Sequence, residues 1–116
     1  MDIATIQADQ VCILELTGRM DATAIDDFDH VVEKIKNEGQ NKILLDMEKL
    51  IYISSAGLRS LLGLAKSLKS VQGKLAFCAL QPMVAEVFRI SGFDRILQIL
   101  TTLTPRNTRL TTINFL

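Results

Sequence analysis

The fold is decided by residues 42–80, which read KILLDMEKLIYISSAGLRSLLGLAKSLKSVQGKLAFCAL. The short apolar run 42–47 is typical of a buried strand. Apolar residues then recur on one helical face, at Leu58, Leu61, Leu62, Ala65 and Leu68. Gly73 ends this helix, and residues 74–80 form a second apolar run. A strand, a helix and a strand in this order predict two parallel strands joined by a right-handed crossover.

On the N-terminal side of this unit, the sequence predicts a β-hairpin. Residues 3–8 and 11–17 are short runs of β-prone residues, separated by Asp9 and Gln10. We expect Gly18 to end the second strand, because glycine commonly interrupts a regular element.

A first helix is predicted between this hairpin and residue 42. Its apolar residues recur at helical spacing, at Ile25, Phe28, Val31, Val32 and Ile35. Thr23 and Asp26 resemble a capping box, with Asp in place of the usual Glu or Gln. Gly39 is the expected end of the helix.

A third helix and a last strand are predicted after residue 80. Pro82 suits the first helical position, and Gly92 closes the helix. Residues 95–100 are the last strand candidate. The order β-β-α-β-α-β-α-β predicts an α/β fold, in which helices cover a small mixed, mostly parallel sheet with an antiparallel hairpin at its start. We expect one domain over 1–100 and a threonine-rich tail, 101–116, to which no structure is assigned.

Composition narrows the function. The 116 residues carry 13 basic and 13 acidic side chains, so the formal net charge is zero and direct nucleic-acid binding is not expected. No apolar run approaches the ~20 residues of a membrane span, and no secretory leader is recognised. Cys12 and Cys78 lie in apolar runs and are interpreted as buried reduced thiols. A cytoplasmic protein without membrane insertion is expected.

An enzyme is not expected, because the chain offers few catalytic parts. His30 is the single histidine, and no phosphate-binding loop, dinucleotide fingerprint or metal-ligand motif occurs. No cofactor is therefore predicted. The alternative is a small hydrolase that uses Ser55 as nucleophile and His30 as base.

The junction before the central helix is the one place that suggests regulation. Ser54, Ser55, Ala56 and Gly57 stand where a strand gives way to a helix. A helix N-terminus favours a phosphate, and a phosphoserine adds roughly −1.5 to −2 charges. The competing interpretation is that one serine is an ordinary N-cap.

Several separated segments together resemble the STAS family, and within it the single-domain anti-sigma factor antagonists of bacteria. The segments are 16–21, 42–46, 52–58, 73–75 and 90–96, and the resemblance covers roughly residues 11–99. It implies the α/β fold described above and a switch protein. In this family the unphosphorylated antagonist binds an anti-sigma factor that is also a serine kinase, which releases a sigma factor.

The resemblance also implies roles for individual residues. It places Ser55 at the phosphorylated position, with Ser54 as competitor in place of a family aspartate, and Ala56 in place of a second hydroxyl. Asp21 matches an aspartate near the acceptor. The implied partner-binding residues are Met20, Asp21, Ser54, Ser55, Ala56, Gly57, Leu58 and Arg59. The implied partners are the anti-sigma factor kinase and a serine phosphatase, bound by a monomer or weak dimer. The alternative within the family is a non-catalytic docking subunit of a transport or signalling assembly.

Overall fold

The computed structural model describes residues 1–93 and 99–100. Its strands are β1 (Asp2–Ala8), β2 (Val11–Met20), β3 (Lys42–Ile53), β4 (Lys74–Cys78) and β5 (Ile99–Leu100). Its helices are α1 (Ile25–Asn37), α2 (Ser55–Ser70) and α3 (Pro82–Ser91). The predicted order of elements is confirmed.

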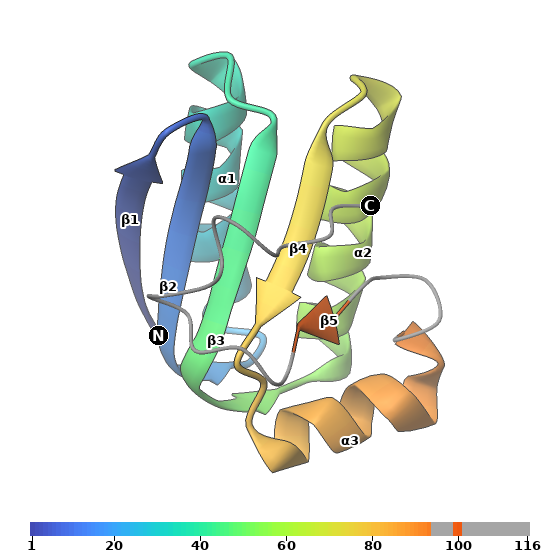
Figure 1. Cartoon of the computed structure of the whole chain (residues 1–116). Helices are drawn as coiled ribbons and strands as arrows, with labels where there is room; N and C mark the ends of the chain where they lie inside the picture. Colours follow the sequence, from blue (N-terminus) through green and yellow to red (C-terminus); the bar gives the residue numbers. More distant parts are fainter. Residues whose placement is uncertain (94–98, 101–116) are drawn as a thin grey trace.

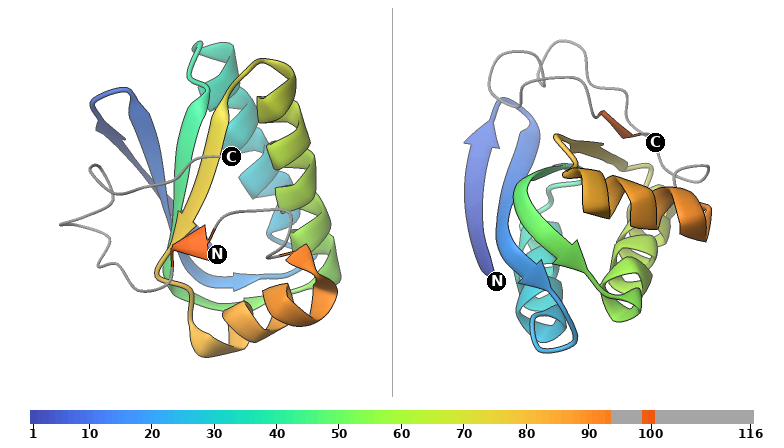
Figure 2. Two further views of the ribbon diagram at one scale, coloured as in Figure 1. Left: turned by 45° about the vertical axis from the view of Figure 1, so that its right-hand side comes forward. Right: turned by 90° about the horizontal axis from the view of Figure 1, so that it is seen from below.

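The strands form one sheet in the order β1-β2-β3-β4-β5. β1 and β2 pair antiparallel, whereas β2, β3, β4 and β5 are parallel to one another, as predicted. Figure 1 shows that α1 and α2 lie together behind the sheet and that α3 crosses below the carboxyl ends of the parallel strands. The two further views place α1 and α2 on the same face of the sheet (Figure 2).

The main core fills the space between the sheet and the helices. It takes alternate residues of the strands together with the inward faces of α1, α2 and α3. Three phenylalanine rings, those of Phe77 in β4, Phe88 in α3 and Phe93, meet edge to face, with the Phe88 and Phe93 centroids 4.9 Å apart. Such pairs contribute about 0.5–1.5 kcal/mol beyond the area that they bury.

A second cluster lies on the opposite face of the sheet and consists of Ile13, Leu44, Ala76 and Cys78. Because β2, β3 and β4 are buried on both faces, their sequences read as continuous apolar runs rather than alternating ones. The two cysteines are buried thiols, as predicted. Cys12 belongs to the main core and Cys78 to the second cluster.

Two strands are longer than the sequence indicated. β2 does not end at Gly18 but continues to Met20, and β3 continues past Met47 to Ile53. Gly18 has φ +107°, and the pairing of β2 with β3 shifts register between Gly18 and Arg19. Glycine adopts this backbone conformation without a steric penalty, so the strand bends there and does not stop.

The ends of the helices were predicted with mixed success. α1 begins at Ile25, and its cap residue Ala24 makes no side-chain cap, so the capping box at Thr23 is wrong. For α3, Pro82 is the first helical residue and Gly92 ends the helix with φ +78°, both as predicted. The last strand is described at Ile99–Leu100; the rest of its predicted range, the proposed domain boundary and the tail 101–116 lie outside the described residues.

Candidate functional site

The candidate site lies where two neighbouring parallel strands end. Met20 and Ile53 are the last residues of β2 and β3, and they are partners in the sheet register. The Ser54 N–H donates a hydrogen bond of 2.9 Å to the Met20 carbonyl oxygen. The residues that follow the strands, Asp21 and Ser54, therefore leave the same edge of the sheet. We call this edge, from Arg19 to Thr23 and from Tyr52 to Arg59, the switch edge.

The two serines of the switch edge have different environments. Ser54 is partly buried and has an extended backbone, and its Oγ accepts a hydrogen bond of 3.1 Å from the Gly57 N–H. It is therefore the N-cap of α2. Ser55 is the first residue of the helix and is exposed. Among the described residues its hydroxyl has no hydrogen-bond partner, so Ser55 is the more exposed of the two serines and its hydroxyl is not engaged in a cap.

Gly57 allows α2 to begin directly on the ends of the strands. A Cβ at this position would lie 2.8 Å from Ile53 Cγ1 and 3.0 Å from the Met20 carbonyl oxygen. Real Cβ atoms do not approach a backbone carbonyl and a core side chain this closely together. The absence of a side chain therefore fixes the position of the first turn, and of Ser55 with it, relative to the sheet.

Asp21 organises the chain between β2 and α1. Its Oδ1 accepts hydrogen bonds from the Thr23 Oγ, at 2.7 Å, and from the Thr23 N–H, at 3.1 Å. The hydrogen bond from the Thr23 hydroxyl is the main cause that lowers the pKa of Asp21 below its ordinary value. Desolvation raises the pKa in part, whereas hydrogen bonds from the backbone of Thr23 and Ala24 and the positive charge of Arg19 lower it further. Asp21 is therefore a fixed negative charge at the switch edge.

A cation stands beside this carboxylate. The guanidinium carbon of Arg19 lies 4.2 Å from the centroid of the Tyr52 ring, and the two residues are partners in the sheet register. Arg19 is exposed and Tyr52 is partly buried. The contact is a cation–π interaction, worth about 0.5–1 kcal/mol at an exposed site. The sequence did not predict the pairing of these two residues, because only the register shift before Arg19 brings them opposite each other.

The predicted partner-binding residues are not equally accessible. Ser55 and Arg59 are exposed, and Asp21, Ser54, Ala56 and Leu58 are partly buried. Met20 and Gly57 are buried, with Met20 0% exposed. Met20 therefore supports the site through its carbonyl oxygen, which accepts the Ser54 N–H, and through its buried side chain. That side chain is not accessible to a partner in this structure.

The described residues assemble no catalytic or metal site around Ser55. His30 is exposed on α1, and no hydrogen bond joins it to Ser54 or Ser55 in the described part of the chain. Residues 1–93 and 99–100 contain no group of three or more side chains that could hold a metal ion. None of the described helices is long and apolar enough to cross a membrane.

Comparisons with known proteins agree on one family. The STAS domain family model matches residues 2–105. A Bordetella bronchiseptica protein with the name "Putative anti-sigma factor antagonist BtrV" is 37% identical over 99 residues, which cover 85% of each chain. The crystal structure of a Thermotoga maritima protein, described as "a putative anti-sigma factor antagonist", superimposes with a TM-score of 0.82 at 26% identity and covers 87% of each chain. The phosphorylated form of Bacillus SpoIIAA has a TM-score of 0.68 at 20% identity, over 87% of this chain and 93% of that one.

Proposed function

The chain belongs to the STAS domain family, and on this premise we propose that it is an anti-sigma factor antagonist switched by phosphorylation of Ser55. In its unmodified form it binds an anti-sigma factor that is also a serine kinase, and so releases a sigma factor. Phosphorylation by that kinase ends binding, and a serine phosphatase restores it. The protein acts by binding rather than by catalysis, in the cytoplasm, where its proposed partners work.

The observation that carries this proposal is that the two serines have different environments. The Ser54 hydroxyl is engaged in capping α2, whereas Ser55 is exposed at the first helical position. A kinase needs a hydroxyl that its own active site can surround. Ser55 meets this requirement, and Ser54 would have to leave its cap to do so.

The charges of the first turn support the same assignment. The first turn of α2 contains no acidic residue, and Arg59 is exposed one turn after Ser55. A phosphate on Ser55 would meet the positive end of the helix dipole without a like charge in that turn. We therefore expect the phosphorylated protein to keep its fold.

The loss of binding then arises at the interface itself. An unmodified Ser55 presents a small neutral surface, flanked by Ala56, which a partner can cover at little cost. A phosphate of roughly −1.5 to −2 charges in the same place must be desolvated. Each 1.4 kcal/mol of this penalty lowers affinity about tenfold.

The test is phosphorylation in vitro by a purified serine-kinase anti-sigma factor with ATP, followed by intact-mass and peptide mass spectrometry. We expect one phosphate, on Ser55, in the wild type and in Ser54→Ala. The matched control is Ser70→Ala, which removes an exposed serine at the other end of α2 and leaves the modification unchanged. Ser55→Ala takes up no phosphate and still binds the kinase, whereas Ser55→Asp binds at least about tenfold more weakly.

The same experiment separates the alternatives. A phosphate mapped to Ser54 would keep the function and move the acceptor by one residue. Absence of phosphate with every kinase tested, together with binding to a component of a transport or signalling assembly, would favour the docking-subunit function. Ester hydrolysis abolished by both Ser55→Ala and His30→Ala would favour the hydrolase.

A further inference from the structure

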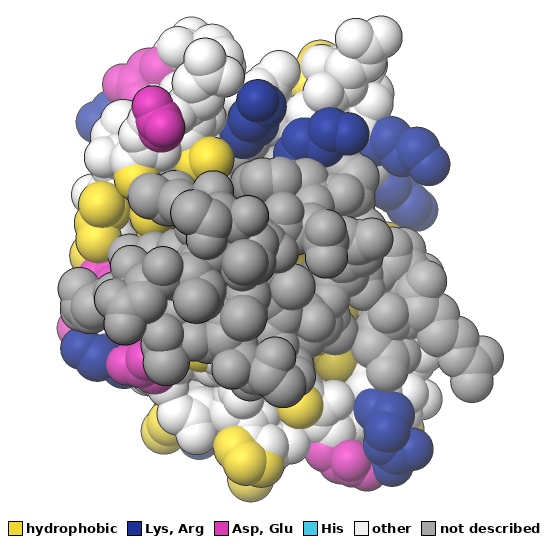
Figure 3. Space-filling model, in the orientation of Figure 1, with side chains coloured by type: hydrophobic (Ala, Val, Ile, Leu, Met, Phe, Trp, Pro, Cys, Tyr) yellow, Lys and Arg dark blue, Asp and Glu magenta, His cyan; other side chains and the backbone are white. Residues whose placement is uncertain are grey.

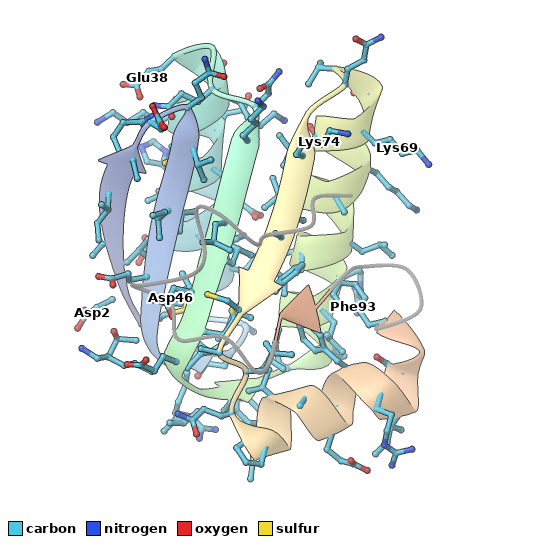
Figure 4. The ribbon with its side chains drawn as sticks, in the orientation of Figure 1. Asp2, Glu38, Asp46, Lys69, Lys74 and Phe93 are labelled. Carbon is cyan, nitrogen blue, oxygen red and sulfur yellow. The ribbon has the colours of Figure 1, made fainter. Side chains whose placement is uncertain are left out.

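Arg59 is the basic side chain closest to Ser55 along α2. The helix contains no acidic residue, and its other basic residues are Lys66 and Lys69. Lys69 stands in the last turn, where a positive charge suits the negative end of the helix dipole. Figure 4 labels Lys69 toward the end of α2 that lies away from the switch edge, and Figure 3 shows basic side chains gathered over that end. Arg59 is therefore the one charged side chain in the first half of α2.

The neighbours of Arg59 on its own helix are all uncharged. Residues three and four positions apart lie on the same face of a helix. For Arg59 these residues are Ser55 and Ala56 before it, and Leu62 and Gly63 after it. Arg59 is exposed, and it forms no ion pair with any residue that the structure describes. While Ser55 is unmodified, Arg59 thus has no charged partner on α2.

The other two helices pair a basic side chain with an acid one turn earlier. In α1, the Lys36 Nζ lies 3.9 Å from Glu33 Oε2, and in α3, Arg89 forms an ion pair with Glu86. In both pairs the acid comes first, because long side chains on a helix lean back toward its N-terminus. The same lean directs a basic side chain in the second turn of α2 toward the first turn, where α2 has no acid.

Arg19, the other exposed arginine of the switch edge, already has partners. Its guanidinium lies over the Tyr52 ring, and its charge contributes to lowering the pKa of Asp21. To hold a new anion, Arg19 would have to weaken these interactions. Arg59 would give up no ion pair or ring contact within the described part of the chain. Of the two arginines, Arg59 is therefore the one available to a phosphate on Ser55.

We infer that Arg59 holds the phosphate once Ser55 is phosphorylated, through charge-assisted hydrogen bonds from its guanidinium to the phosphate oxygens. The inference rests on the proposed phosphorylation of Ser55 and concerns how the modified protein places the new charge. The acid at position i and the base at position i+4 have the favourable order on a helix. Arg59 is thus a positioning residue, which changes from an unpaired surface cation to the partner of the phosphate.

This pairing has two consequences for the modified protein. It ties the first turn of α2 to the second, so phosphorylation should stabilise the domain. It also occupies the phosphate with a cation of the same chain. A basic group on a partner protein then gains less from meeting the phosphate, because it has to compete with Arg59. The modified surface stays unfavourable for binding even to a partner that has a cation to offer.

The test is a thermodynamic cycle on the full-length protein, with genetically encoded phosphoserine at position 55, so that the result does not depend on a kinase. We expect the phosphate to raise the Tm of the wild type by at least about 1 °C more than that of Arg59→Gln. Arg59→Lys keeps the charge and should retain most of this difference. The matched control is Lys66→Gln, which removes a charge about 16 Å from Ser55 along the helix, beyond the Debye length. It should leave the effect of the phosphate unchanged.

Nuclear magnetic resonance reports the pair directly. In isotope-labelled protein, the Nε–Hε resonance of Arg59 should move on phosphorylation by much more than that of Arg19. An equal rise of Tm in the wild type and Arg59→Gln, with an unmoved Arg59 resonance, would overturn the inference. A rise that is lost in Arg19→Gln and kept in Arg59→Gln would overturn it by assigning the phosphate to Arg19. A rise that is lost equally in Lys66→Gln would overturn it as a general charge effect.

The encoded phosphoserine separates this inference from the proposed function. If anti-sigma factor kinases leave Ser55 unmodified while the encoded phosphate still depends on Arg59, the pairing holds and the proposed function fails. If a kinase modifies Ser55 and the phosphate shows no dependence on Arg59, the proposed function holds and the inference about Arg59 fails.

Discussion

The starts of α1 and α2 lie at the same edge of the sheet but are fixed in different ways. At α1, the cap residue Ala24 is helical in backbone conformation and makes no side-chain cap, and the Asp21 carboxylate binds Thr23 just before the helix. At α2, Ser54 is extended and its hydroxyl accepts the Gly57 N–H. The start of α2 is held directly against the ends of β2 and β3, because the Ser54 N–H donates to the Met20 carbonyl and Gly57 lies close to Met20.

Their first turns differ in charge as well. Asp26 and Asp27 stand in the first turn of α1, where they satisfy the positive end of its dipole, whereas the first turn of α2 has no acid. The start of α1 thus carries its own negative charge. The start of α2 is rigid, neutral and exposed at Ser55, which is the condition under which an added phosphate changes the surface most.

The largest effect on stability is expected at Gly57, where the start of α2 lies close to Ile53 and the Met20 carbonyl. Gly57→Ala places a Cβ against Ile53 and the Met20 carbonyl, and a backbone carbonyl cannot turn away as a side chain can. We expect a loss of about 1–3 kcal/mol in the free energy of unfolding, measured by urea denaturation. A neutral Gly57→Ala would show that the start of α2 is not constrained by the strands.

Gly63→Ala is the matched control for this substitution. Gly63 is exposed in the middle of α2, and an added Cβ would meet nothing within 4 Å. The same change should therefore raise stability by about 0.5–1 kcal/mol, because alanine loses less backbone freedom on folding. A loss of stability in Gly57→Ala and a gain in Gly63→Ala would show that the loss arises from the close contacts of Gly57 and not from helix propensity.

The next effect concerns the two serines. Ser54→Ala removes the side-chain cap of α2 and should cost about 1 kcal/mol of unfolding free energy in the same assay. Ser55→Ala, at an exposed position, should change stability by less than about 0.5 kcal/mol. If Ser55→Ala lost more unfolding free energy than Ser54→Ala, then Ser55 would be the cap of α2 and Ser54 would carry the free hydroxyl.

The sequence predicted this contrast in part. The order of elements, the serine cap of α2 and the ends of α3 follow from local signals that act within a few residues, such as Pro82 at the first helical position. The start of α1 did not follow from them, because Thr23 and Asp26 have the spacing of a capping box and yet Thr23 binds Asp21. A local hydrogen bond two residues earlier competed successfully with the cap.

What sequence reasoning missed depends on pairing between strands. β3 continues to Ile53, but the exposed polar residues Glu48 and Lys49 interrupt its apolar run, so the sequence predicted a strand that ends at Met47. The register shifts at Glu15/Thr17 and Gly18/Arg19 decide which residues of β2 and β3 face each other. Bulges of this kind have no reliable local signature, so the pairing of Arg19 with Tyr52 becomes visible only in the fold.

A smaller effect is expected from that pair, which lies between the two helix starts. A double-mutant cycle of Arg19→Gln and Tyr52→Leu should give a coupling energy of about 0.5 kcal/mol in thermal or urea unfolding. The cycle of Arg59→Gln with Tyr52→Leu is the control, since Arg59 belongs to α2 and, within the described part of the chain, contacts no aromatic ring. Equal coupling in both cycles would indicate a general charge effect rather than a cation–π contact.

The smallest effect tests the start of α1 by pH. Because the Thr23 hydroxyl and its other neighbours lower the pKa of Asp21 in the folded protein, ionised Asp21 stabilises the fold at pH values above its ordinary pKa of about 3.9. This contribution disappears as the pH falls through the lower pKa of the folded state. The difference in Tm between the wild type and Asp21→Asn should therefore be constant near neutrality and shrink below about pH 4. Thr23→Val removes the principal donor, and in that background the pH dependence should be reduced. A difference that persists unchanged into acid would mean that Asp21 supports α1 through its shape and hydrogen bonds alone, and that its charge does not distinguish the two helix starts.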